Sequence, residues 1–298
     1  MRKPIVDIDQ LTAAVISHYG KIDHMEPVQD GMESFAFRLV ISGKKYVLRV
    51  NHRVEGFEKD DFVNRHLAGP GLPVPEIEAI GLLESGIAWC LSALAPGVTL
   101  QDLPAAYLPA VTAPLAAVMQ AMAAAPLDKV TGFGPFNSRG EGQYASWKAY
   151  LESICGDTTY DWPTAGKRVP MKRIRPLQEL LLLAIRDIPE VRQLVHGDFG
   201  SNNVLTDGHV ITGVIDWSEA MAGDSLYDMA NIFFWRTWLN CMEQQARYFE
   251  AQGIDKTRLA AYQLRIGLEE VYQTAVTGDM DDMDWALVRC EHLAGIAR

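Results

Sequence analysis

The sequence predicts an α+β fold of two lobes: a small β-rich N-terminal lobe with one helix, and a larger, mainly helical C-terminal lobe. Strand-like runs are concentrated in the first ninety-odd residues, and long helical patterns occupy the remainder. The turn sequence Ala95-Pro96-Gly97 lies between them and suits a hinge. We therefore expect two domains, residues 1–96 and 97–298, in a chain long enough to bury a core in each.

The N-terminal lobe is expected to begin with a β-hairpin. Apolar, β-branched and aromatic residues predict four strands in this lobe, at residues 35–41, 45–50, 77–83 and 87–91. Ser42-Gly43-Lys44 provides the turn between the first two. Phe62, Val63 and Leu67 fall on one stripe of a helix expected over residues 58–67, and the Gly- and Pro-rich segment after it ends that helix.

The C-terminal lobe is expected to consist mostly of helices. Their predicted ranges are residues 108–125, 144–154, 176–186, 225–238, 243–251, 257–277 and 283–296. Two short strands, at residues 204–205 and 210–215, interrupt them and are joined by Asp207-Gly208. Segment 163–176 is basic and broken by Pro and Gly, so we expect a mobile loop there.

Composition predicts a cytoplasmic protein without a membrane partner. The N-terminus lacks the apolar core of a signal peptide, and we expect no stretch of 18 uncharged apolar residues. The four cysteines are widely separated and contain no CxxC pair, which favours reduced thiols over disulfides or a zinc site.

Charge is unevenly distributed along the chain. Residues 190–298 carry 8 Lys+Arg and 17 Asp+Glu, a net −9 of the −11 of the whole chain. Nucleic-acid binding needs clustered Lys and Arg, so we expect no nucleic-acid partner. An acidic cleft would concentrate a cationic substrate. A generic solvated acidic surface explains the same charge equally well.

The chemistry is concentrated in Val195–Asn203 and the following Val214–Trp217. These segments contain Asp198, Asn203 five positions later, and Asp216 at the end of an apolar strand. Phosphoryl transfer needs one Asp to hold the acceptor hydroxyl, and an Asn and a second Asp to hold the magnesium ions on the nucleotide phosphates. The sequence therefore predicts Asp198 as the catalytic base and the other two as Mg²⁺ ligands.

The motif His196-Gly197-Asp198-x4-Asn203, with Ile215-Asp216-Trp217, resembles the signature of the aminoglycoside phosphotransferase family. Within that family, the resemblance is greatest to the hygromycin B 4-O-kinases. It is carried by Gly97–Pro104, Gly132–Phe136, Leu194–Asp207, Val214–Ala220 and Ala230–Trp235, and extends from near the N-terminus to about residue 290. The resemblance implies a protein-kinase-like bilobal fold, ATP and Mg²⁺ as cofactors with GTP not excluded, and a cationic antibiotic as substrate.

The nucleotide would lie between the lobes. No GxGxxG is present; the equivalent turn, Asp30–Phe35, offers Ser34 to the phosphates. Arg49 stands where a protein kinase carries a phosphate-pairing Lys. The resemblance selects Asp60 as its carboxylate partner, with Glu58 as the alternative. The hinge would meet adenine through backbone groups near Ala93 and Ala95; ordinary strand-end packing is the competing explanation.

Two further residues are expected to support the loop. In this family the residue corresponding to His196 packs beneath the loop, with a role as general base as the alternative. In kinase-like folds an Asp in the place of Asp228 braces the loop. The expected substrate contacts are acidic or aromatic: Glu219, Asp224, Glu269, Glu270, Trp235 and Trp238. The acidic run at residues 279–284 is as compatible with a solvated helix start as with substrate contact. Packing is the default role for both Trp residues.

We expect a monomeric kinase that phosphorylates a hydroxyl of hygromycin B and so confers resistance. Alternatives with the same chemistry are kinases for another aminoglycoside, a macrolide or an amino-alcohol metabolite. A nucleotide-binding pseudokinase is a remote alternative, because Asp198, Asn203 and Asp216 are all present. Two features argue against a protein kinase. Gly197 stands where protein kinases usually carry Arg, and the eight residues between Asp216 and Ser225 leave no room for a phosphorylatable activation loop.

Overall fold

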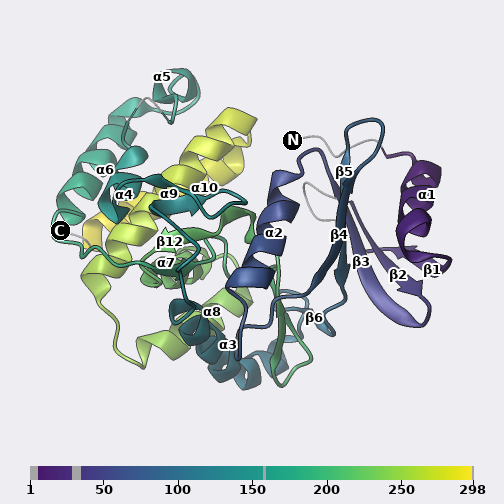
Figure 1. Cartoon of the computed structure of the whole chain (residues 1–298). Helices are drawn as coiled ribbons and strands as arrows, with labels where there is room; N and C mark the ends of the chain where they lie inside the picture. Colours follow the sequence, from purple (N-terminus) through teal and green to yellow (C-terminus); the bar gives the residue numbers. More distant parts are fainter. Residues whose placement is uncertain (1–5, 29–34, 157–158, 297–298) are drawn as a thin grey trace.

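The N-terminal lobe is built on one antiparallel sheet. The computed structural model describes residues 6–28, 35–156 and 159–296 (Figure 1). Within them, five strands form the sheet in the order β1-β2-β3-β5-β4. Their bounds are β1 Ile22–Pro27, β2 Phe35–Ile41, β3 Lys44–Asn51, β4 Ile77–Leu82 and β5 Ala88–Ala93. The four strands expected from the sequence are therefore present within a residue or two at each end, and β1 is an addition.

Two helices accompany this sheet, not one. The expected helix is α2, Glu55–His66. The other is α1, Ile8–Tyr19, which begins at an Asp7 cap and ends at Gly20. Leu11 and Val15 of α1 are fully buried in a cluster with the strands. The expectation of a single helix is therefore wrong in this detail, although the α+β, two-lobed class is confirmed.

The C-terminal lobe consists mainly of helices, which occupy the left of Figure 1. They are α3 Leu108–Ala123, α4 Trp147–Ser153, α5 Trp162–Ala165, α6 Met171–Ala184, α7 Leu226–Trp235, α8 Asn240–Glu250, α9 Lys256–Thr277 and α10 Met280–Ile296. Every helix expected in this lobe is present, with shifted ends. The segment expected to be a mobile loop is instead α5 and the first turns of α6. Asp161 caps α5, and Trp162 is buried, so apolar packing organises this basic segment.

Two small sheets hold the segments that carry the chemistry. The first contains β6 Val98–Thr99, β10 Val204–Thr206 and β11 Ile211–Val214, in the order β11-β10-β6. The second contains β7 Phe133–Phe136, β8 Gly142–Tyr144, β9 Gln193–Val195 and β12 Met221–Gly223, in the order β8-β7-β12-β9. The sequence predicted only β10 and β11. The others have two to four residues, too few to show a period-2 pattern.

Residues 105–123 form a longer apolar stretch than the sequence was expected to contain. Residues 105–123 are long and apolar enough, by length and composition alone, to cross a bilayer, so the expectation that no such stretch exists is wrong. In the structure this segment is a short 3₁₀ turn followed by α3. Helix α3 contacts α8, β9 and β11, and Val111, Leu115 and Met122 lie in the main core. A helix that forms part of a core needs this apolar composition without a membrane.

Candidate active site

The loop from His196 to Asn203 connects β9 to β10 and lies where the two small sheets meet. Gly197 in this loop has φ 87°, and an added Cβ would collide with the Glu219 carbonyl oxygen. A side chain therefore does not fit here, which explains the glycine where protein kinases carry Arg. The Asn203 amide donates to the Gly200 carbonyl, and the Ile215 amide donates to the Asn203 carbonyl. These bonds fix the loop against the strand that precedes Asp216.

Asp198, Asn203 and Asp216 are brought together, as the sequence predicts. The Asn203 Nδ2 atom donates to the Asp198 Oδ2 atom at 2.8 Å and to the Asp198 carbonyl at 2.9 Å. The Asp216 Oδ1 atom accepts from the Ser218 hydroxyl at 2.8 Å. Desolvation by the surrounding protein, followed by the charge of Asp216, raises the pKa of Asp198 to about 6. Its side chain is nevertheless open to solvent, which moderates this effect.

The donor set at this position suits magnesium. Because Asn203 uses Nδ2 for Asp198, its Oδ1 atom remains an acceptor, and Asp216 retains its Oδ2 atom. Both are hard oxygen ligands, and Mg²⁺ usually takes one or two protein ligands together with phosphate oxygens and water. No cluster of three or more His, Cys, Asp or Glu able to hold a metal occurs in the part of the chain that the structure describes. The residues present thus fit an ion shared with a nucleotide better than one held by protein alone.

Helix α7 braces the loop from below with side chains three residues apart. Asp228, 1% exposed, accepts from the His196 amide at 2.8 Å and from the Gly197 amide at 2.9 Å. Burial raises the pKa of Asp228 to about 7, and the two amides oppose this shift. Asn231 donates to the Phe199 carbonyl at 3.1 Å, on the other side of Asp198. The backbone of the loop is therefore held on both sides of the candidate base.

His196 is placed as a scaffold residue. Its ring is fully buried and lies 4.5 Å from the Trp217 ring. Its Nε2 atom lies 3.0 Å from the Ile215 carbonyl, and its Nδ1 atom lies 3.3 Å from the Asp198 amide. Donation by Nε2 and acceptance by Nδ1 is the tautomer that this network requires. Desolvation lowers the pKa of His196 to about 4, so a neutral ring with both nitrogens occupied is unsuited to act as a base.

On the nucleotide side, Arg49 of β3 pairs with Asp60 of α2. The Nη2 to Oδ2 distance is 2.5 Å, and both side chains are largely buried. Burial is the largest single influence and disfavours the Arg49 cation, but the charges of Asp60, Cys90 and Asp216 and the hydrogen bond to Asp60 together raise the pKa of Arg49. The alternative partner, Glu58, instead accepts from the Ser138 hydroxyl. Ser34 and the turn around it lie outside the described residues, so their placement against the phosphates stays a prediction.

An apolar cavity lies between the lobes beside this ion pair. Its lining includes Val47, Ile77, Ala93, Ala95, Leu205 and Val214. The Ala93 amide is already used, because it donates to the Glu76 carbonyl at 2.8 Å. The Ala95 amide bonds to none of the described residues. The backbone groups left for an adenine edge are therefore the Ala93 carbonyl and the Ala95 amide. The expected adenine contacts near these two residues are thus reduced to two specific groups.

Asp224 is a correction to the expected substrate contacts. It is 4% exposed, and its Oδ2 atom accepts from the Tyr262 hydroxyl at 2.8 Å and pairs with Arg258 at 3.2 Å. Glu269 is also occupied: its two carboxylate oxygens receive the Arg265 guanidinium at 2.7 Å and the Tyr160 hydroxyl at 2.6 Å. A carboxylate that is buried or internally neutralised has little attraction left for a substrate ammonium group. We therefore remove Asp224 from the candidates and treat Glu269 as mainly structural.

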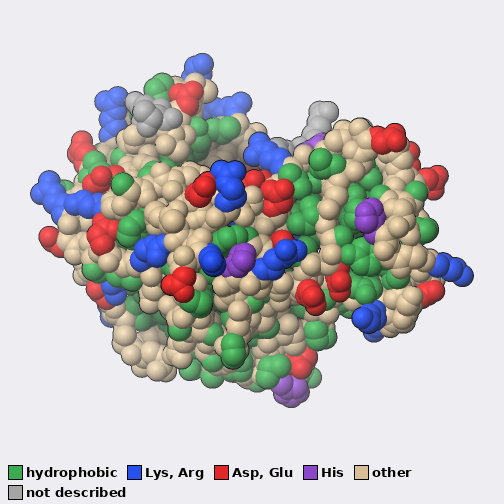
Figure 2. Space-filling view, viewed as in Figure 1, with side chains coloured by type: hydrophobic (Ala, Val, Ile, Leu, Met, Phe, Trp, Pro, Cys, Tyr) green, Lys and Arg blue, Asp and Glu red, His purple; other side chains and the backbone are tan. Residues whose placement is uncertain are grey.

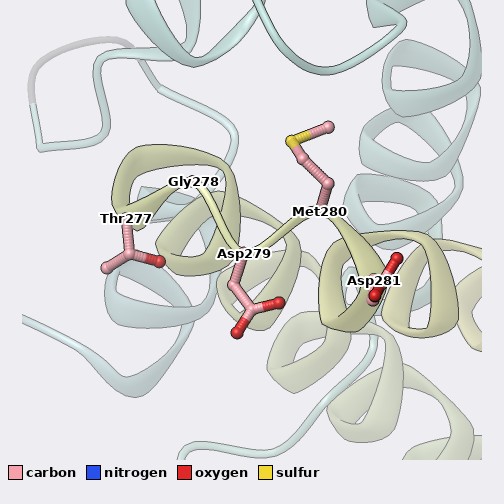
Figure 3. Close-up of a pocket in the computed structure, with 5 residues that line it drawn as sticks. All are labelled: Thr277, Gly278, Asp279, Met280 and Asp281. Atoms are coloured by element: carbon pink, nitrogen blue, oxygen red, sulfur yellow. The ribbon is translucent and has the colours of Figure 1, made fainter.

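Glu270 is the better placed carboxylate. It is half-buried on α9, and its side chain makes no hydrogen bond or ion pair with the residues described. Desolvation first, then the charges of Asp282, Glu269 and Asp198, raise its pKa to about 7. An open hollow of about 550 Å³ lies at the α9–α10 turn nearby, where Figure 3 shows Asp279 and Asp281. The acidic run expected either to be solvated or to contact substrate thus borders an open surface hollow, and both roles stay predictions.

The remaining candidates are exposed to different degrees. Glu219 is exposed and contributes to the negative field at Asp198. Trp238 is 49% exposed, whereas Trp235 stacks on Trp285 with ring centroids 5.0 Å apart and planes 16° apart. Trp238 also contacts Trp285, edge to face at 4.8 Å. The sequence indicated the Trp235–Trp238 pair but not Trp285, which completes the cluster from α10.

Lys59 and Asn231 are two site residues that sequence reasoning missed. Asn231 could have been found, because it is three residues after Asp228 and shares its helical face. Lys59 carried no such signal, since one Lys in an amphipathic helix is usually solvated. Its side chain is instead buried between the lobes.

Figure 2 shows Lys, Arg, Asp and Glu side chains mixed on the face where the lobes meet, without a basic patch.

Comparison with known proteins identifies the family. A model of the phosphotransferase enzyme family matches residues 24–262. The chain belongs to this family. Another member, the hygromycin-B 4-O-kinase of Escherichia coli, is 48% identical over 295 residues, covering 98% of this chain and 86% of the relative.

Solved structures of the family share the whole fold. The crystal structure of aminoglycoside phosphotransferase APH(4)-Ia has a TM-score of 0.93 at 46% identity, over 97% of this chain and 98% of that one. A thermostable mutant of the same enzyme, in a ternary complex with AMP-PNP and hygromycin B, has a TM-score of 0.91 at 48% identity. It covers 96% of this chain and 98% of its own. The kinase-like, two-lobed family fold is therefore confirmed for this chain.

Proposed function

We propose that this protein transfers the γ-phosphoryl group of ATP to the 4-hydroxyl of hygromycin B and thereby inactivates the antibiotic. The observation that carries the reaction type is the contact of Asp198 with Asn203, in a loop fixed against Asp216. The acceptor is taken from the 48% identical hygromycin-B 4-O-kinase. Another aminoglycoside, a macrolide or an amino-alcohol stays an alternative acceptor for the same chemistry.

In this proposal Asp198 orients the acceptor hydroxyl and accepts its proton as the new P–O bond forms. Asn203 Nδ2 holds the carboxylate in place, and α7 holds the loop. Asn203 Oδ1 and Asp216 would bind Mg²⁺, which when present neutralises charge on the phosphates. Arg49, fixed by Asp60, would receive a phosphate through its remaining donors, and adenine would lie between Ala93 and Ala95 in the apolar cavity.

Recognition of the antibiotic would fall to the helical lobe. Glu270, with the carboxylates at the α9–α10 turn, would attract ammonium groups, and the exposed face of Trp238 would support a sugar ring. We propose residues 1–96 as the nucleotide-binding lobe, because β5 ends at Ala93 and β6 already pairs with β10 of the other lobe. One chain supplies both walls of the cleft, which supports a monomer. The four cysteines are free, which supports a cytoplasmic enzyme.

The test is Mg²⁺-dependent ADP release from purified protein with a panel of acceptors, with ATP or GTP as donor, followed by NMR of the product. We expect hygromycin B to be the best acceptor and the product to carry phosphate on O4. Asp198→Ala should lower kcat by several orders of magnitude with nearly unchanged nucleotide affinity. A folded, nucleotide-binding protein that releases no ADP with hygromycin B contradicts the proposal. So does near-native turnover by the Asp198→Ala variant.

A further inference from the structure

Asp216 has an unusual backbone conformation. Its φ is 61° and its ψ is 69°, in the left-handed region; among the described non-glycine residues, only Ser42 shares a positive φ. L-residues occupy this region at a cost in free energy, so the neighbouring structure must hold it in place. The conformation turns the chain sharply from β11 into the 3₁₀ turn Trp217–Glu219. The contacts that hold residues 217 and 218 therefore also hold Asp216.

Two consecutive residues of α2 provide those contacts. The Asp60 Oδ1 atom accepts from the Trp217 amide at 2.7 Å. The Lys59 ammonium group donates to the Ser218 carbonyl at 2.6 Å. One residue thus holds an amide and the next holds a carbonyl of the turn that follows Asp216. Because Asp60 also pairs with Arg49, Lys59 is the member of this pair whose hydrogen bond goes to the turn alone.

Lys59 is an unusual lysine. It is 3% exposed, and its Nζ atom lies 5.0 Å from the centre of the Phe136 ring. Burial lowers the pKa of Lys59 to about 8, while the charges of Glu219, Glu55, Asp60 and Asp216 oppose the shift, so the group is mostly charged at pH 7. A buried ammonium group is unfavourable unless it is paired and hydrogen-bonded. A solvated Lys would have avoided that cost, so the burial needs an explanation beyond helix formation.

Helix α2 is also fixed to the C-terminal lobe on its other side. Phe62 and Val63 belong to the main core of that lobe, and the Phe62 ring lies 5.8 Å from the Phe136 ring. Glu55 accepts from the Ser138 amide at 3.0 Å. In Figure 1, α2 lies between the sheet and the helical lobe. The helix is thus a fixed support, and Lys59 extends from it to the turn.

We propose that Lys59 is a positioning residue for the metal–nucleotide site: its ammonium group holds the Ser218 carbonyl, and so keeps Asp216 in the left-handed conformation that presents its carboxylate to Mg²⁺. The inference rests on the proposed function, because it assumes that Asp216 binds the ion. Lys59 does not line the apolar cavity between the lobes, and in this proposal it acts only through the turn. Its removal should therefore weaken Mg²⁺-dependent binding selectively.

Lys59→Met tests this, because it preserves side-chain volume and removes the ammonium group. Binding of ADP is measured by calorimetry in EDTA and across a Mg²⁺ titration, without an acceptor. We expect the half-saturating Mg²⁺ concentration to rise about tenfold, which corresponds to about 1.4 kcal/mol. ADP affinity in EDTA should stay within about twofold, because in this proposal Lys59 acts on binding only through Asp216 and the metal ion. Lys59→Arg should recover much of the Mg²⁺ affinity.

The matched control is Lys148→Met, since Lys148 also donates to a carbonyl, that of Arg186 at 3.3 Å, but on the surface. It should change neither titration. The inference about Lys59 is overturned if Lys59→Met leaves the Mg²⁺ requirement unchanged, or if it weakens ADP binding equally with and without Mg²⁺. Either result leaves the proposed function standing. If Lys59→Met does not fold, Lys59→Gln and Lys59→Arg are compared in the same titration, and equal Mg²⁺ requirements refute it. A wild-type protein that binds no Mg²⁺–ADP overturns the proposed function as well.

Discussion

Replacement of Asp228 by Asn should damage the candidate catalytic loop more than the rest of the fold. Asp228 accepts one backbone amide on each oxygen, from His196 and Gly197. Asn retains one acceptor and turns an NH₂ group toward the second amide. A buried donor without its acceptor costs about 1–3 kcal/mol, which is a factor of about 5–150. Because both amides belong to the loop, this cost falls on the conformation that orients Asp198.

We expect Asp228→Asn to lower kcat about 5- to 150-fold and the free energy of unfolding by about 1–3 kcal/mol. The KM for ATP should hardly change. A coupled ADP assay and urea unfolding measure these quantities.

Asp207→Asn is the control. Asp207 also accepts two backbone amides, from His209 at 2.9 Å and Val210 at 3.0 Å, but through one oxygen and on the surface. Its replacement should change stability by less than about 0.5 kcal/mol. The reasoning fails if Asp228→Asn keeps native kcat, or if the two variants unfold alike.

Two other predictions follow from buried or half-buried charges. Arg49→Met leaves the Asp60 carboxylate buried and unpaired, so we expect a loss of about 3–5 kcal/mol in urea unfolding and a raised KM for ATP. Adding Asp60→Asn should restore much of the stability but not the KM; recovery of both would contradict a phosphate-binding role for Arg49. The raised pKa of Glu270 predicts that the KM for hygromycin B falls as pH rises from about 6 to 8, because the carboxyl ionises through about 7. The same shift disfavours the ionised form in the folded protein. Ionised Glu270 therefore destabilises the folded protein. This destabilisation is absent at pH values below the pKa of Glu270 in the unfolded chain, and complete at pH values above its pKa in the folded protein. Glu270→Gln should accordingly raise Tm at pH 8 but not at pH 4. A pH-independent KM for hygromycin B in the wild type would contradict a binding role for Glu270. A gain in Tm at both pH values for Glu270→Gln would contradict its raised pKa.

The sequence was most informative where chemistry depends on spacing along the chain. Asp198, Asn203 and Asp216 lie on a short loop and a strand end, so the expected grouping followed from local structure alone. Asp60 was harder, and only the resemblance selected it over Glu58. Helix α1 was missed because Ile8 and Ile16 are exposed and weaken its apolar stripe, although Leu11 and Val15 are buried.

The substrate side was predicted less well, because burial is a tertiary property. Nothing in the order of residues distinguishes Asp224, which is buried against Tyr262 and Arg258, from Glu270, which is half-buried without such partners among the described residues. Lys59 illustrates the same limit, since its partner is 159 positions away. Neither periodicity nor composition predicts which charged side chain will be buried by a segment distant in the sequence.

The strand β12 has a consequence for inhibition. It follows Asp216 closely, and it is paired on one edge with β7 and on the other with β9, with all three of its residues buried. Moving this segment would break two ladders at once, so a second arrangement of Asp216 should have a negligible population. A ligand can select only a state that is populated. Compounds designed to trap a displaced, inactive form of this segment should therefore find no target.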